Sequence, residues 1–203
     1  MIYQQGQYKE ELFLQKWLRL NIEELNKQIN NPSLKFKSLE GFEVICESLV
    51  YKIYDIYGRN TLLSMLYQIG KGPGEIIANR IKEKYNKEEF GITEAIEILL
   101  GELKDYYSIQ IRDIEEHAHM LRLIIENRCF LREPMKDREK LKFGKAFCRI
   151  NKGYFEEAFK QLIGDKIKNI EINFLDNDEA NDTCVEEVNF YYNDSTFDWK
   201  SYT

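Results

Sequence analysis

The segment YSIQIRDIEEHAHMLRLIIENRC, residues 107–129, decides the fold class of this chain. In its second half, the apolar residues Leu121, Leu123 and Ile125 alternate with other residues. Successive side chains of a β-strand point to opposite faces of a sheet, so a period of two is typical of strands. Because the polar run EEH at residues 115–117 lies near its middle, the segment predicts a β-hairpin.

The same alternation returns at residues 167–175 and 184–192, where two more strands are expected. Elsewhere, apolar residues recur every three or four positions, the spacing of one face of an amphipathic helix. Helices are expected at residues 9–29, 41–58, 61–85, 93–103 and 141–162. Proline removes a backbone donor and clashes with the preceding turn, so Pro73 predicts a kink or break in the third helix.

This order of elements predicts an α+β protein with helices packed on a four-stranded antiparallel sheet. We divide the chain into an N-terminal amphipathic helical extension at residues 1–33, an α+β domain at residues 34–193 and a tail at residues 194–203. Hydrophobic residues make up 43% of the 203 positions, which is enough for a sizeable core and excludes disorder of the whole chain.

The charge balance argues against nucleic acid as a partner. Lys and Arg number 29 against 35 Asp and Glu, a net charge of −6, whereas affinity for a phosphate backbone comes mostly from clustered basic residues. The N-terminal sequence has no basic stretch before a long apolar run, and no segment reaches the ~20 apolar residues that span a bilayer. We therefore expect a cytoplasmic protein without a transmembrane segment.

Two short motifs are weak candidates for binding sites. GKGPG at residues 70–74 lacks the G-x-x-x-x-G-K-[ST] spacing of a phosphate loop and lies within helical periodicity, so tight helix packing explains it better. His117 and His119 would put both rings on one face of a strand, as metal ligands require. Their neighbours Glu115 and Glu116 indicate a solvated turn instead.

The cysteines are more informative. Cys129, Cys148 and Cys184 stand on three elements that a sheet could bring together at one end, and thiolates with a carboxylate suit a tetrahedral zinc ion. However, no pair has C-x-x-C spacing, and free cysteine is also a common small buried residue. On spacing alone, zinc ligands and packed thiols both remain open.

Several short blocks together resemble a known family. They are IGKGPGEIIA at residues 69–78, IIENRC at 124–129, FCRINKGYFE at 147–156, IEI at 170–172 and CVE at 184–186. In their order along the chain they are similar to the 4-vinyl reductase domain family, whose relatives include the Bet-type subunits of the TRAPP vesicle-tethering complex. The resemblance implies a helix-covered antiparallel sheet around an apolar pocket, and pairing of two copies through helices.

The resemblance implies a ligand site between the sheet and the helices. Its apolar pocket would be lined by Leu121, Leu123, Ile125 and Phe147. These side chains would otherwise be ordinary core residues. A closed cavity beside them would distinguish a binding module from a scaffold.

The resemblance also implies a zinc site. The family's helix cysteine, carboxylate and last-strand cysteine match Cys148, Glu171 and Cys184. The remaining position, three residues after the carboxylate, holds Phe174, so Cys129 would have to supply the fourth ligand. Strand alternation places Glu171 opposite the apolar side chains of its strand, where a solvated glutamate is the alternative.

Three functions remain open. The resemblance favours a non-catalytic module that binds a hydrophobic small molecule, a lipid or an acyl chain. The alternative is a TRAPP-like scaffold or vesicle-tethering subunit that acts through protein partners, and we expect a homodimer. An enzyme acting on a tetrapyrrole or similar ring ranks third, because no acid, base or nucleophile constellation is apparent and Glu186 and Glu187 point to opposite faces of a strand.

Overall fold

The computed structural model describes residues 24, 26–27, 38–132, 146–178 and 183–192. The predicted helix at residues 9–29 and the predicted tail at residues 194–203 lie almost entirely outside this part of the chain. By its contacts the chain separates into two units, Met1–Cys46 and Glu47–Thr203. The site described below lies within the second unit.

Four strands form one antiparallel sheet, as the alternating pattern predicted. They are β1 (Tyr107–His117), β2 (Met120–Cys129), β3 (Ile167–Asp178) and β4 (Thr183–Tyr192), in the spatial order β1-β2-β4-β3. β1 and β2 are the predicted hairpin, and β3 and β4 pair with each other. The two pairs join where β2 runs antiparallel to β4, with Leu123 opposite Val188.

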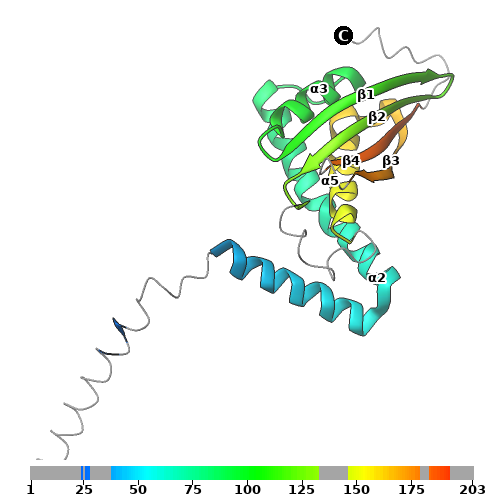
Figure 1. Cartoon of the computed structure of the whole chain (residues 1–203). Helices are drawn as coiled ribbons and strands as arrows, with labels where there is room; N and C mark the ends of the chain where they lie inside the picture. Colours follow the sequence, from blue (N-terminus) through cyan, green and yellow to red (C-terminus); the bar gives the residue numbers. More distant parts are fainter. Residues whose placement is uncertain (1–23, 25, 28–37, 133–145, 179–182, 193–203) are drawn as a thin grey trace, which may run out of the picture. The chain divides into compact units, whose positions relative to one another are not determined.

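Two helices pack with this sheet (Figure 1). α5 (Ala146–Ile163) contacts β3, and α3 (Ile92–Glu102) contacts α5. A short 3-10 turn, Gly164–Lys166, leads from α5 into β3. The predicted α+β architecture, with helices packed on a four-stranded antiparallel sheet, is therefore confirmed.

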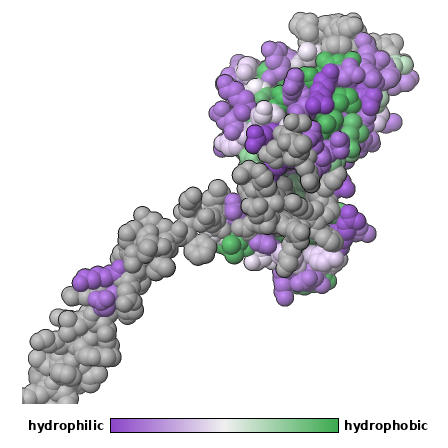
Figure 2. Space-filling view, in the orientation of Figure 1, coloured by the Kyte–Doolittle hydropathy of each residue, from purple (hydrophilic) through white to green (hydrophobic). Residues whose placement is uncertain are grey.

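The core lies between the helices and one face of the sheet. Its buried strand residues occupy alternating positions: Leu121, Leu123, Ile125, Ile170, Ile172, Val188 and Phe190. Phe159 of α5 packs edge-on against Phe190, with the ring centroids 5.2 Å apart. On the opposite face, Arg122 Nε donates a hydrogen bond to Glu187 Oε1 at 2.6 Å. Glu186 and Glu187 thus point to opposite faces of β4, as predicted. In Figure 2, hydrophilic residues cover much of the described surface, with apolar residues between them.

α2 runs from Ser38 to Tyr85 and bends at Gly58, where φ is 77° and ψ is 174°. Glycine adopts a positive φ with little steric cost, and the predicted helix boundary at Gly58 is present as this kink. The interruption predicted at Pro73 was wrong, because α2 continues through it. Pro73 is exposed, so water can bond the carbonyl group that loses its amide partner.

Glycines allow α2 and α5 to pack with their backbones in close contact. A Cβ atom added at Gly70 would collide with the Ile150 carbonyl oxygen, and one added at Gly153 would collide with the Tyr67 carbonyl oxygen. Gly74, one turn after Gly70, is in equally tight contact with the backbone of α5. Tight helix packing, the preferred interpretation of the GKGPG motif, is confirmed.

The length of α2 does not make it a membrane span. Although α2 has 48 residues, neither it nor another helix in the described ranges is apolar enough over a sufficient length to cross a bilayer. The expectation of a chain without a transmembrane segment therefore holds for this part of the sequence.

Candidate functional site

A cavity of about 380 Å³ lies between α5, β3, β4 and the part of α2 that follows the kink. Its polar lining residues are Arg59, Cys148, Arg149, Asn151, Lys152, Asn173 and Glu186, and its apolar ones are Phe155, Ile172 and Phe174. Ligand pockets in proteins typically measure about 300–1,000 Å³. The cavity therefore has the size and the mixed lining of a small-molecule site.

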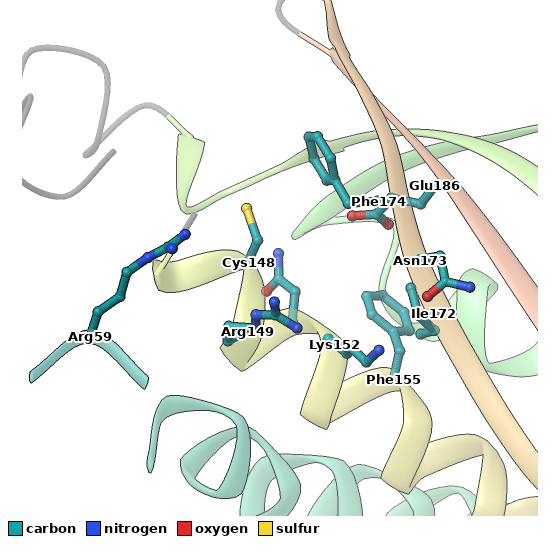
Figure 3. Close-up of a pocket in the computed structure, with 10 residues that line it drawn as sticks. Arg59, Cys148, Arg149, Lys152, Phe155, Ile172, Asn173, Phe174 and Glu186 are labelled. Carbon is teal, nitrogen blue, oxygen red and sulfur yellow. The ribbon is translucent and has the colours of Figure 1, made fainter. Parts of the chain in front are cut away.

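The regular spacing of side chains along α5 and β3 explains which of their residues line the cavity. Helical spacing places Cys148, Lys152 and Phe155 in succession along α5 (Figure 3). β3 contributes Ile172 and Phe174, which are two residues apart and so point to the same face of the strand. The side chain of Arg59 extends toward the cavity from the segment just after the kink in α2 (Figure 3).

Positive charge dominates the lining. Lys152 Nζ lies 3.4 Å from Glu156 Oε1, so its charge is partly balanced. The carboxylate of Glu156 also accepts hydrogen bonds from the Tyr67 hydroxyl at 2.7 Å and from the Ile172 amide at 2.8 Å. Among the residues that the structure describes, no carboxylate pairs with Arg59 or Arg149.

One carboxyl group lines the cavity from the core side. Glu186 is only 9% exposed, and burial raises its pKa because the charged form loses water. Asn127 Nδ2 donates a hydrogen bond to Glu186 Oε2 at 3.4 Å, which opposes this rise only weakly. Within the described part of the chain, Asn127 Oδ1 is buried without a hydrogen-bond partner.

Two thiols lie beside this carboxyl group, at the same end of the sheet. Burial raises the pKa of the Cys129 thiol, which is hydrogen-bonded to Asn151. Asn151 also accepts a hydrogen bond from the Tyr107 hydroxyl at 3.0 Å. Burial raises the pKa of Cys184 to about 11, even though Arg132 Nη1 lies 2.9 Å from its Sγ atom. Both thiols are therefore protonated near neutral pH.

The four predicted metal ligands do not lie on one side of the sheet: three are on the core side, and Glu171 points away from it. Cys129 and Cys184 lie near the core face, and Cys148 faces the cavity from α5. Glu171 accepts a hydrogen bond at 3.2 Å from the hydroxyl of Tyr191, an outward-facing residue of β4. In the described residues, no three His, Cys, Asp or Glu side chains are grouped closely enough to hold a metal ion. The zinc site stays a prediction.

The histidines lie at the hairpin turn, as the neighbouring glutamates indicated. His117 Nε2 lies 3.4 Å from Glu115 Oε2, in a pair of exposed side chains. His119 is also exposed. Neither histidine lines the cavity.

The predicted pocket residues separate into two groups. Leu121, Leu123 and Ile125 are at most 6% exposed and belong to the main core. The void that Leu123 and Ile125 line measures about 10 Å³, too little for a ligand. Phe147 packs instead with a second cluster around Leu62 and Leu66 of α2. Ligand contact by these four residues stays a prediction.

We did not predict the charged residues that line the cavity from the sequence. Glu186 could have been found, because it shares the alternation of Val188 and Phe190 and must face the core with them. The arginines gave no such signal. Arg59 and Arg149 are 90 positions apart on two different helices, and only the folded chain brings them to the same cavity.

Comparisons with known proteins give distant likenesses to solved structures. No family model matches the chain, and no curated protein matches it. Among solved structures, the chain is similar to the phenol-responsive sensory domain of the transcription activator PoxR with phenol. The identity is 13%, the TM-score is 0.46, and the match covers 75% of this chain and 77% of that chain. A likeness of this size leaves the ligand of this chain open.

Proposed function

We propose that this domain is a non-catalytic module that binds a small, partly hydrophobic molecule in the cavity between α5 and β3. The observation that carries the proposal is the cavity itself, with about 380 Å³ of space beside Phe155, Ile172 and Phe174. An apolar wall with a few convergent polar groups is the usual composition of a ligand site. The family-like blocks quoted above, from IGKGPGEIIA to CVE, agree with this proposal.

The cavity shares some of its lining residues with the small core void beside the predicted pocket residues. Phe155, Ile172 and Glu186 border both the cavity and the small core void beside Leu123 and Ile125. A ligand that displaced the Phe155 ring would therefore reach the two predicted contact residues. Such a ligand would contact both the observed cavity and the pocket residues that were expected from the sequence.

The lining supports binding more than catalysis. The carboxyl of Glu186 is held by Asn127, and no histidine is near it to relay a proton. The residues that line the cavity around the Cys148 thiol include no histidine that could act as its base. We propose that the cavity positions a ligand without transforming it.

A neutral fluorescent probe, N-phenyl-1-naphthylamine, tests the proposed function on the full chain. One molecule is expected to bind per chain, and Cys148→Trp, which fills the cavity, should abolish binding. Lys160→Trp adds the same side chain to an exposed position of α5 and should leave binding unchanged. If Cys148→Trp fails to fold, Phe174→Ala should still weaken binding. Equal affinity in Phe174→Ala, Cys148→Trp and the control would reject the cavity as a ligand site.

A second role, in protein contacts, is favoured by exposed apolar side chains on α2. Met65, Ile69 and Ile76 are 39%, 53% and 55% exposed, and helical spacing places all three on one side of α2. We propose that a second copy of the chain covers this stripe, because two identical stripes can pair about a two-fold axis. Native mass spectrometry would report this dimer together with any bound zinc or co-purified ligand.

A further inference from the structure

We infer that the ligand of the cavity is an amphipathic organic anion, whose acid group pairs with Arg59 and Arg149 and whose apolar body packs against Phe155 and Phe174. This inference rests on the proposed function and adds the chemical class of the ligand to it.

The two arginines provide the recognition of the acid group. Arg59 comes from α2 and Arg149 from α5, and both line the same cavity (Figure 3). In the described part of the chain, neither has a carboxylate partner, although other arginines such as Arg122 are paired at 2.6 and 2.9 Å. A guanidinium group binds carboxylate, sulfonate or phosphate oxygens through two parallel hydrogen bonds. Both residues are exposed, so an anion that enters the cavity can reach their guanidinium groups.

The charge of the remaining lining favours an anion over a cation. Lys152 adds a third positive group to the lining, while Glu186 is the one acidic residue among those that line the cavity. Glu186 lies on the core side, buried beside Asn127. The charge of Lys152 is partly balanced by its ion pair with Glu156. A bound cation would face three positive side chains for one carboxyl group. A bound anion would instead be attracted by three positive side chains and repelled by one carboxyl group.

The apolar wall explains why an inorganic anion would leave part of the site unused. Phe155, Ile172 and Phe174 supply two aromatic rings and an aliphatic side chain on the other side of the cavity. Burying such surface is favourable only if the ligand carries an apolar ring or chain. An acid group attached to a ring or chain satisfies both walls at once.

The experiment compares two probes that differ in one acid group. 8-Anilinonaphthalene-1-sulfonate carries a sulfonate, and N-phenyl-1-naphthylamine is the same ring system without it. Arg59→Gln and Arg149→Gln are each expected to weaken binding of the sulfonate about ten-fold or more, the effect of losing one hydrogen-bonded charge. Binding of the neutral probe should change less than about two-fold in both variants, because it makes no such bond. Arg149→Lys should restore part of the sulfonate affinity.

Arg80→Gln is the matched control, because Arg80 is exposed on α2 and does not line the cavity. Unchanged sulfonate affinity in Arg59→Gln and Arg149→Gln, or an equal loss in Arg80→Gln, would overturn the inference. The proposed function would survive that result if the neutral probe still bound and Cys148→Trp still abolished it. Absence of binding by both probes would reject both proposals.

Competition then separates two sources of such an anion. Decanoate carries its carboxylate on a chain, and 1-naphthoate carries it on a ring. Displacement of the sulfonate probe by either acid supports the inference and identifies the kind of apolar body. If neither acid displaces the probe, the assignment of the cavity to organic acids is wrong.

Discussion

Glu186 places a carboxyl group where the rest of its strand places apolar side chains. Its neighbours on the same face, Val188 and Phe190, are 3% and 0% exposed. A charge at such a position costs free energy, because the protein cannot replace the water that the carboxylate loses. One hydrogen bond from Asn127 at 3.4 Å compensates only in part. Such conflicts between local environment and residue type are expected at functional sites.

Glu186→Gln tests this cost through its pH dependence. The pKa of Glu186 is raised in the folded state, so the folded chain binds more protons than the unfolded chain between the two pKa values. The unfolding free energy of the wild type therefore falls as pH rises through that window. At pH 8 the glutamine variant should be more stable by about 1.4 kcal/mol per unit of pKa difference. The advantage should shrink as pH falls toward the ordinary carboxyl pKa of ~4.3.

Urea denaturation at several pH values would measure the effect. Glu97→Gln, at an exposed position of α3, is the control and should differ little from the wild type at each pH. A constant stability difference between Glu186→Gln and the wild type at pH 5 and pH 8 would contradict the assignment, because it would not depend on ionisation.

At the scale of elements, the contact between α2 and α5 depends on three glycines. Gly70, Gly74 and Gly153 leave no room for a Cβ atom, whereas nothing lies within 4 Å of one added at Gly72. The same helix thus contains glycines that packing requires and a glycine that it does not. This contrast separates the effect of close approach from the low helix propensity of glycine.

Gly70→Ala and Gly153→Ala should therefore destabilise the fold by roughly 1–3 kcal/mol each, because the added methyl group collides with backbone atoms that cannot move aside. Gly72→Ala should instead stabilise it by up to about 1 kcal/mol, since alanine is the better helix former. Thermal and urea unfolding of the three variants would measure the differences. Destabilisation by Gly72→Ala equal to that of Gly70→Ala would show that packing is not the cause.

The periodicity predicted the strands closely and the helix interruptions less well. β1 to β4 were expected because alternation survives wherever one face of a sheet is buried. At Gly58 and Pro73 the sequence predicted two interruptions, and α2 bends at the first while continuing through the second. Packing of Gly70 and Gly74 on α5 holds the helix on both sides of Pro73. Tertiary contacts of this kind are invisible to a local pattern.

At the scale of the whole second unit, the fold was predictable and the cavity was not. The order of helices and strands fixes an antiparallel sheet with covering helices. The cavity instead combines Arg59, the start of α5, Phe174 and Glu186, which are far apart in the sequence. Although Arg149 and Glu186 lie in two of the family-like blocks, nothing in these blocks indicates a shared cavity, so only the folded chain brings the lining residues together. The pocket residues expected from the family resemblance lie instead in the neighbouring core and, for Phe147, in the cluster around Leu62.

The exposed stripe on α2 carries the last prediction, that the chain forms a homodimer. Ile69 and Ile76 are more than half exposed and seven residues apart, the spacing at which helices pair side by side. Light scattering after gel filtration should give the mass of a dimer for the full chain. Ile69→Lys combined with Ile76→Lys should give a monomer, because each charge would have to be buried in the contact. Gln68→Lys, at an exposed polar position one residue away, should leave the dimer intact.

Deletion of residues 1–33 separates this contact from the predicted N-terminal extension. If α2 alone forms the interface, the shortened chain should remain dimeric, and if the amphipathic helix predicted at residues 9–29 contributes, it should become monomeric or aggregate. The full chain eluting as a monomer at concentrations well above micromolar would reject a homodimer through either element, because interfaces that bury apolar helix faces are typically stable in that range.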